Sequence, residues 1–166
     1  MARIGSFGLI HSGGEWILQM KDQQLTDVAG KLCLFGGWSD EVSPGVRETP
    51  DKTLVRELEE ELGLQEFSYQ FVRETVVDIG GEPYHYHVYF VDAPVMPTTL
   101  TREGVAVRFL HCDLMKLLLG EGVPLFKGPR KGQIQKIFLP HIAEACATIL
   151  STYQYCHKMI EVKNAS

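Results

Sequence analysis

The sequence predicts an α/β fold in which a mixed β-sheet carries helices on both faces. Two stretches, 3–20 and 67–92, consist of paired β-rich runs that have the pattern of strand hairpins. A helix with start and stop signals at Thr49 and Gly63 lies between them, and an amphipathic helix follows Pro140. This order of strands and helices is typical of a mixed sheet that is covered on both sides.

Length and composition indicate one globular domain. The chain has 166 residues, of which 45% are hydrophobic, so residues 1–166 are expected to form a single domain with a substantial core. The net charge of −5 disfavours binding to nucleic acid or to an anionic membrane through overall charge. Neither a signal-peptide pattern nor a membrane-spanning apolar run is present, which indicates a cytoplasmic protein. The four cysteines lack metal-site spacing and are expected to be reduced thiols.

The N-terminal part is expected to form a hairpin and a further short strand. Residues 3–11 and 16–20 have strand patterns and are joined by a Ser-Gly-Gly turn. Residues 32–35 form a short apolar strand that leads into Gly36 and Gly37. Glycine at these positions allows a close backbone approach to a ligand or metal.

The helix that follows has its own boundaries and two different faces. Thr49 is a suitable N-cap, Pro50 at the first helical position loses no hydrogen bond, and Gly63 favours a C-terminal stop. The residues expected to face the core are Leu54, Val55, Leu58 and Leu62. The acidic residues Glu57, Glu60 and Glu61 lie together on another face. Carboxylates at this spacing repel one another, and a hard divalent cation such as Mg²⁺ would offset the repulsion. The alternative is a solvated acidic face without a metal.

The segment around this helix resembles the Nudix box. From Glu48 the sequence continues with seven residues and then Arg-Glu-Leu-Glu-Glu-Glu-Leu-Gly-Leu, which ends at Leu64. The family pattern is Gly, five residues, Glu, seven residues, and Arg-Glu-apolar-any-Glu-Glu-any-Gly-apolar, and every fixed position from Glu48 to Leu64 matches it. One departure occurs, because ten residues rather than five separate Gly37 from Glu48. The connecting loop is therefore five residues longer than in the pattern.

The resemblance implies a Nudix-like α/β/α sandwich with a mixed β-sheet and a Mg²⁺-dependent hydrolase, for which Mn²⁺ is a possible substitute. The implied reaction is water attack at a phosphorus of a nucleoside diphosphate linked to another moiety, as in a nucleoside triphosphate, a nucleotide sugar or ADP-ribose. The expected partner is thus a small nucleotide, and a homodimer is compatible with the resemblance. Two alternatives are a Nudix-like module that binds a nucleotide without cleaving it and an isomerase of prenyl diphosphates. The box retains all its carboxylates, which favours the hydrolase over the binding module.

The resemblance also implies roles for the residues of the box. The expected metal ligands are three helix carboxylates and a backbone carbonyl, namely those of Glu57, Glu60, Glu61 and Gly37. Arg56 is expected to orient Glu57 or Glu48 through a bidentate pair. The general base is expected to be Glu60 or Glu103, the latter on a loop ahead of a strand and a short helix. A solvated loop residue is the alternative for Glu103.

Substrate contacts are expected from residues outside the acidic face. Lys21 follows the second strand, where similar proteins often place a basic residue against phosphate, although an ordinary surface lysine is the alternative. Trp38 could stack on a nucleobase, as could the rings at 84–86, and Glu48 completes the expected substrate-binding set. His85 and His87 form a His-x-His pair, for which we expect packing or substrate contact rather than a zinc site.

The C-terminal half is expected to complete the sheet and its cover. The runs 67–78 and 84–92 are joined by a Gly-Gly-Glu-Pro turn, and residues 105–111 have a strand pattern. Residues 113–119 are expected to form a short helix. The helix after Pro140 is expected to cover the sheet.

Overall fold

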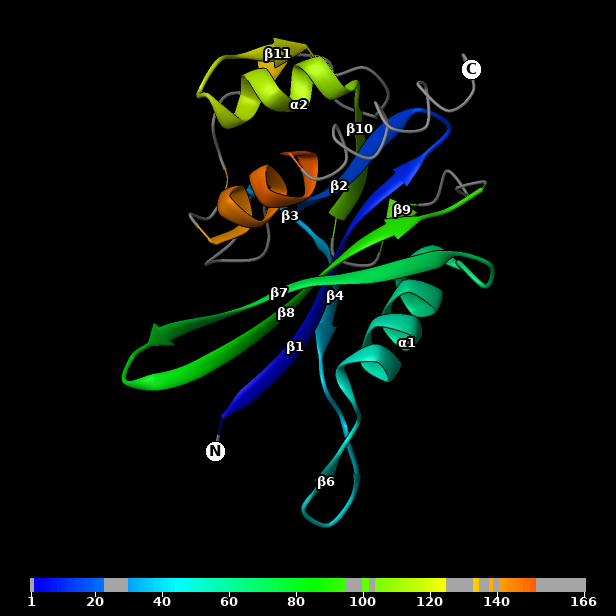
Figure 1. Ribbon diagram of the computed structural model, residues 1–166, viewed down its shortest axis with the longest axis vertical. Coiled ribbons are helices and arrows are strands. Elements are labelled where there is room, and N and C mark those ends of the chain that lie inside the picture. Colours follow the sequence, from blue (N-terminus) through cyan, green and yellow to red (C-terminus); the bar gives the residue numbers. More distant parts are fainter. Residues whose placement is uncertain are drawn as a thin grey trace, which may run out of the picture.

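A computed structural model describes residues 2–22, 30–94, 100–101, 104–124, 133–134, 138 and 141–151. It has a mixed central sheet with helices on both faces, which confirms the predicted α/β/α arrangement (Figure 1). Within these ranges, no helix combines the length and the apolar character that a membrane crossing requires.

Among the described residues, the main sheet has eight strands and is organised around β1. The strands are β1 (Arg3–Ser12), β2 (Glu15–Lys21), β3 (Leu32–Cys33), β4 (Phe35–Trp38), β7 (Ser68–Ile79), β8 (Glu82–Asp92), β9 (Leu100–Thr101) and β10 (Gly104–Phe109). Their order is β7-β8-β1-β2-β10-β9, while β3 pairs with β2 and β4 pairs with β1. Strand β1 pairs in parallel with β8 along one edge. Along its other edge, β1 pairs antiparallel with both β2 and β4. Strand β4 pairs with residues 5–8 of β1 and β2 pairs with residues 10–12, so these two partners part near the middle of β1.

Neighbouring residues of the central strands face opposite sides of the sheet and build two apolar cores. On one side, Leu9 of β1 packs in a cluster with α2 (His111–Leu118) and the helix at 141–151. On the other side, Ile10 packs in a cluster with α1 (Pro50–Leu62). The helix predicted after Pro140 therefore covers the sheet, on the face opposite α1.

The boundaries of α1 confirm the predicted start and stop. Thr49 occupies the N-cap position, although its side chain makes no capping hydrogen bond with any described residue. Gly63 adopts the left-handed conformation, with φ 64°, and its N–H donates to the carbonyl of Glu59. The prediction that Val55 belongs to the core is wrong, because Val55 lies about 100° around the helix from Leu54 and is exposed.

The additional residues between Gly37 and Glu48 form a short hairpin. Its strands are β5 (Glu41–Ser43) and β6 (Val46–Arg47), which pair antiparallel and project from the end of β4 (Figure 1). At its base the N–H of Glu48 donates to the carbonyl of Asp40 over 2.9 Å. Because this bond closes the hairpin, the insertion leaves the preceding glycine beside α1.

The predicted strand at 32–35 is divided into β3 and β4, and β4 continues through both glycines to Trp38, whereas the other predicted elements differ from the structure mainly at their ends. Strands β7 and β8 form the predicted second hairpin with a turn at Gly80 and Gly81. Helix α2 begins at His111, two residues before the predicted start, because the carbonyl of Leu110 already accepts hydrogen bonds from Asp113 and Leu114. The predicted strand at 105–111 accordingly ends at Phe109. A small pairing of β11 (Val123–Pro124) with β12 (Gln133–Ile134) was not predicted.

Candidate functional site

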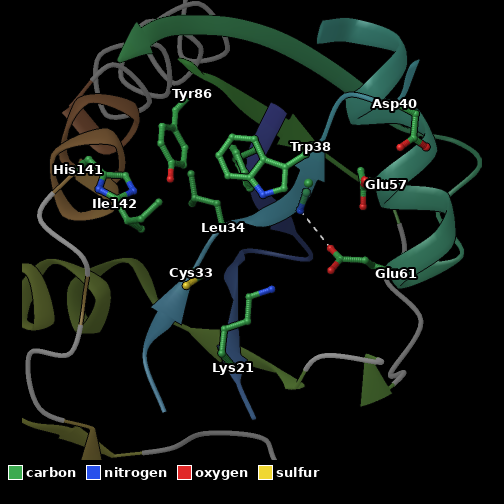
Figure 2. Close-up of a pocket in the computed structure, with 13 residues that line it drawn as sticks. Lys21, Cys33, Leu34, Trp38, Asp40, Glu57, Glu61, Tyr86, His141 and Ile142 are labelled. Atoms are coloured by element: carbon green, nitrogen blue, oxygen red, sulfur yellow. Dashed lines mark hydrogen bonds between the residues drawn. The ribbon is translucent and has the colours of Figure 1, made fainter. Parts of the chain in front are cut away.

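A cavity of about 500 Å³ lies between α1 and the helix at 141–151 (Figure 2). One end carries the carboxylates of Asp40, Glu57 and Glu61. The other end is formed by Tyr86, His141 and Ile142, Phe7 packs against Tyr86, and the ring of Trp38 lies between the two ends (Figure 2). Gly36, Gly37 and Lys21 also line the cavity, which therefore joins a charged end to an aromatic end.

The two glycines of β4 allow close contacts that other residues would prevent. A Cβ on Gly37 would lie 2.5 Å from Cδ and Oε1 of Glu57, so the absence of a side chain lets this carboxyl group lie against the strand. A Cβ on Gly36 would lie 2.0 Å from the carbonyl oxygen of Ser6, which is a backbone atom of β1. Gly36 also has φ 135°, a conformation that other residues rarely adopt. The missing side chain of Gly37 thus leaves room for the carboxyl group of Glu57, whereas that of Gly36 leaves room for the backbone of β1.

The guanidinium of Arg56 joins the carboxylates behind the cavity. Its Nε lies 3.2 Å from both carboxylate oxygens of Glu48, and its Nη2 donates to Oε2 of Glu48 over 3.0 Å. Its Nη1 donates to Oε1 of Glu57 over 2.8 Å, and its Nη2 also donates to the carbonyl of Trp38 over 3.1 Å. Arg56 therefore makes the multidentate contact with Glu48 and a single contact with Glu57.

The two carboxylates beside Arg56 have opposite pKa shifts. The hydrogen bond from Arg56 holds the pKa of Glu48 below its ordinary value. Burial raises the pKa of Glu57, and this effect outweighs the stabilisation of its charge by Arg56. The same partners raise the pKa of Arg56, which stays protonated. Glu57 is thus a partly desolvated carboxylate held next to a permanent positive charge.

Glu61 is oriented by donors from two strands. The backbone N–H of Gly36 donates to Oε2 of Glu61 over 3.1 Å, the bond drawn in Figure 2. The side-chain Nε2 of Gln19 donates to Oε1 over 3.3 Å from β2. Since Glu57 and Glu61 are one helical turn apart, both carboxyl groups face the same end of the cavity.

Glu60 lies at the rim of this arrangement. Its side chain is 57% exposed, and one carboxylate oxygen lies 3.4 Å from Nη1 of Arg56. In the described part of the chain, no three His, Cys, Asp or Glu side chains are placed together so that they could hold a metal ion. Of the three glutamates predicted as metal ligands, Glu57 and Glu61 line the cavity and Glu60 does not.

The other predicted site residues are distributed in three ways. Lys21 and Trp38 line the cavity, as expected for residues that contact substrate. Glu48 instead lies behind Arg56 with a side chain that is 12% exposed, so its contacts are with protein groups. Glu103 lies outside the described residues.

The aromatic strand β8 presents its residues to two different faces. Tyr86 lines the cavity, and Tyr84 contacts the ring of Trp38 with centroids 5.4 Å apart. His85 lies on the opposite face, where its Nδ1 is hydrogen-bonded to Glu74 of β7. His85 therefore does not line the cavity, and its contact with Glu74 agrees with the packing interpretation.

Three residues of the arrangement were missed by the sequence analysis. Gln19 is buried in β2, Asp40 belongs to the insertion, and His141 lies at the start of the last described helix. Residues 16–20 of β2 are all buried, which makes Gln19 an unusual polar residue in a core strand. The sequence carries no comparable signal for Asp40 or His141, because tertiary packing alone brings them to the cavity.

Comparison with solved structures shows that the chain has the Nudix fold. A NUDIX hydrolase from Nitrosomonas europaea superposes with a TM-score of 0.61 at 14% identity, covering 92% of this chain and 90% of that one. A MutT NUDIX hydrolase from Burkholderia pseudomallei gives 0.57 at 18% identity, covering 90% and 98%. The NUDIX domain of Shewanella oneidensis NrtR, crystallised with ADP ribose, gives 0.53 at 9% identity, covering 70% and 77%. No protein-family model and no curated protein sequence matches the chain.

Proposed function

We propose that this protein is a Mg²⁺-dependent hydrolase of the Nudix type, which cleaves the pyrophosphate linkage of a nucleoside diphosphate joined to another moiety. The observation that carries the proposal is the placement of Glu57 and Glu61 against the glycine backbone of β4, at the charged end of a cavity. The candidate substrates are nucleoside triphosphates, nucleotide sugars and compounds of the ADP-ribose type. The ADP ribose bound to the structurally similar NrtR domain supports a nucleotide ligand.

The donor groups at this end fit Mg²⁺, with Mn²⁺ as a substitute. Carboxylate and carbonyl oxygens are the hard ligands that these ions prefer. The residues that would hold the ion are Glu57, Glu61 and, through its carbonyl, Gly37, and Glu60 would join them by turning its exposed side chain from the rim toward the ion. Gly37 fits this role because a Cβ there would occupy the space of the Glu57 carboxyl group. When bound, the ion would neutralise the pyrophosphate, lower the pKa of the attacking water and stabilise the leaving oxygen.

The proposed work of Arg56 is to position carboxylates. Its bonds to Glu48 and to the carbonyl of Trp38 fix the guanidinium plane, which leaves Nη1 directed at Glu57. The permanent charge of Arg56 then favours the ionised form of Glu57 against the effect of burial. Glu48 accordingly acts through Arg56, whereas our sequence analysis had placed it among the substrate contacts.

Other residues would contact the substrate or the attacking water. Lys21 enters the cavity from β2 and would donate to a phosphate oxygen. The ring of Trp38, on the path from the carboxylates to the aromatic end, would contact the nucleoside (Figure 2). The general base would be Glu60, whose exposed carboxylate is accessible to water, or Glu103.

The proposal is tested by phosphate release from a panel of pyrophosphate compounds. Nucleoside triphosphates, nucleotide sugars, ADP-ribose and dinucleoside polyphosphates are incubated with Mg²⁺ or with chelator, and phosphatase is added to release phosphate from the products. We expect Mg²⁺-dependent turnover of at least one compound and a loss of about two or more orders of magnitude in Glu57→Gln. Glu59→Gln is the matched control, because it makes the same change at an exposed position of α1. Equal activity of the two variants would contradict the ligand assignment.

A nucleotide-binding module without hydrolytic activity is the second candidate. The exposed position of Glu60 favours it, because only two of the three glutamates predicted as ligands, Glu57 and Glu61, line the cavity. This function predicts that a compound of the panel raises the melting temperature of the wild type while no compound is turned over. Mg²⁺-dependent turnover would exclude it.

A further inference from the structure

We infer that Asp40, a residue of the lengthened loop between Gly37 and Glu48, determines which moiety follows the pyrophosphate of the ligand. Its carboxylate accepts hydrogen bonds from a moiety that bears hydroxyl groups, and it repels a moiety that is a further phosphate. The inference rests on the proposed function, and it narrows the ligands to nucleoside diphosphates joined to a hydroxyl-rich moiety, in preference to nucleoside triphosphates. It also gives a role to the loop residues that the box pattern does not specify.

The backbone of Asp40 is fixed at the base of the hairpin formed by β5 and β6. The N–H of Glu48 donates to the carbonyl of Asp40 over 2.9 Å, and the N–H of Asp40 donates to Oε2 of Glu48 over 3.3 Å. Arg47 of β6 adds a third bond, from its Nη1 to the carbonyl of Ser39 over 3.1 Å. The side chain of Asp40 therefore starts from a defined point of the backbone and lines the cavity.

The carboxylate of Asp40 keeps acceptor capacity for a ligand. It is 71% exposed, and its Oδ2 lies 3.5 Å from Nη2 of Arg56, whereas a charge-assisted hydrogen bond is about 2.7 to 2.9 Å long. The two hydrogens of Nη2 have nearer acceptors, which are Oε2 of Glu48 at 3.0 Å and the carbonyl of Trp38 at 3.1 Å. Arg56 thus attracts the charge of Asp40 while the lone pairs of this carboxylate stay accessible from the cavity.

The charge of Asp40 is left over when the other charges of the cavity have been assigned. The charged side chains that line the cavity in the described part of the chain are those of Lys21, Asp40, Glu57 and Glu61. Under the proposed function, Glu57 and Glu61 face the ion and Lys21 faces a phosphate, so these charges are neutralised around the pyrophosphate. Burial raises the pKa of Glu57, and the charge of Asp40 adds to this effect, which indicates that the field of Asp40 reaches the charged end.

Asp40 also lies on the appropriate side of the cavity. In Figure 2, it is grouped with Glu57 and Glu61 on the side of Trp38 that is remote from Tyr86. A ligand whose nucleoside contacts Trp38 and whose pyrophosphate lies at the two glutamates has its remaining moiety on the side that Asp40 occupies. A hydroxyl group there donates a hydrogen bond to the carboxylate. A terminal phosphate carries a charge of about −1.5 to −2 and meets a like charge instead.

Analogues that cannot be cleaved test the inference without hydrolysis. In analogues of ADP-ribose, ADP and ATP, methylene groups replace the oxygens between phosphorus atoms, and isothermal titration calorimetry with Mg²⁺ gives their dissociation constants. The corresponding analogues of UDP-glucose, UDP and UTP are measured in parallel, so that the result does not depend on one base. We expect the wild type to bind the sugar-bearing analogue of one base about tenfold or more tightly than the triphosphate analogue.

Two substitutions of Asp40 separate its charge from its acceptor atoms. Asp40→Asn keeps an acceptor oxygen and removes the charge, so it should raise the affinity for the triphosphate analogue about fivefold to tenfold and change that for the sugar-bearing analogue less. Asp40→Ala also removes the acceptor, so it should weaken binding of the sugar-bearing analogue roughly tenfold. Because the side chain is exposed and the hairpin bonds of this residue are made by its backbone, both variants should keep the fold.

Two controls make the result specific. Glu59→Gln removes the same charge from an exposed position of α1 and should bind every analogue like the wild type. High salt should reduce the effect of Asp40→Asn on the triphosphate analogue, since exposed charges are screened. The inference is overturned if the wild type binds the triphosphate analogue as tightly as the sugar-bearing one, if it binds neither, or if both Asp40 variants leave the ratio of the two affinities unchanged.

The outcomes also separate this inference from the proposed hydrolysis. Discrimination between the analogues that depends on Asp40, without turnover of any compound of the panel, supports the inference and contradicts the hydrolase. Mg²⁺-dependent turnover with equal preference for triphosphates and nucleotide sugars, unchanged in Asp40→Asn, supports the hydrolase and contradicts the inference.

Discussion

The contact between Gly37 and Glu57 makes Gly37→Ala the most informative single substitution. The new Cβ would lie 2.5 Å from Cδ of Glu57, whereas ordinary contacts begin near 3.4 Å, so the carboxyl group must move by about 1 Å. Glu57 is a flexible side chain, and it can make this movement without a change in the backbone. The substitution therefore displaces the carboxylate and keeps its charge.

The expected effect on stability is small. Displacement of Glu57 weakens its 2.8 Å ion pair with Arg56, whose side chain is 24% exposed, and the loss is about 1 kcal/mol after screening by solvent. Alanine offsets roughly 0.4 to 1 kcal/mol of this loss by reducing the entropy of the unfolded chain. We expect the free energy of unfolding to change by less than about 1 kcal/mol, while metal affinity falls roughly tenfold to hundredfold.

Denaturant unfolding and Mn²⁺ titration by electron paramagnetic resonance measure these two quantities. Gly36→Ala is the contrasting variant, because its Cβ would meet a backbone oxygen of β1, and it should destabilise the fold by several kcal/mol. In a background of Glu57→Ala, the clash at Gly37 is absent, so Gly37→Ala should cause no further loss of metal affinity. Wild-type metal affinity and turnover in Gly37→Ala alone would refute this reasoning.

Two further predictions concern the core and the ion pair between Arg56 and Glu48. Leu58→Ala should lower the free energy of unfolding by about 2 to 5 kcal/mol, since Leu58 is fully buried; an unchanged denaturation midpoint would contradict this. Arg56 lowers the pKa of Glu48, so the contribution of this pair to the free energy of unfolding is complete above pH 4.5 and is lost as pH falls through the lower folded-state pKa. When the free energy of unfolding is measured over acid pH, Glu48→Gln should lack this component.

The helix of the candidate site could be predicted from the sequence because its determinants are local. A proline at the first helical position, a glycine stop and carboxylates at helical spacing all lie within residues 49–63. The alternating runs of β1, β2, β7 and β8 likewise gave the two hairpins, since pattern and turn residues determine them.

The rest of the site depends on contacts between distant parts of the chain. Pairing of β1 with β4 brings Gly37 beside Glu57, and packing of the last described helix brings His141 beside Tyr86. The direction of Glu60 depends on Arg56, which binds Glu48 and Glu57 more closely than it binds Glu60. Helical spacing places a carboxylate on a face, but it does not determine which competing partner the side chain contacts.

The most direct test of the proposed hydrolysis is ³¹P nuclear magnetic resonance of the reaction in H₂¹⁸O, with each compound of the panel. The proposal predicts that one pyrophosphate linkage is split with Mg²⁺ and that ¹⁸O appears in one phosphate product. It also predicts that chelator or the Glu57→Gln substitution abolishes the reaction. Products whose phosphates contain no ¹⁸O, or the absence of cleavage across the whole panel, would contradict water attack at phosphorus.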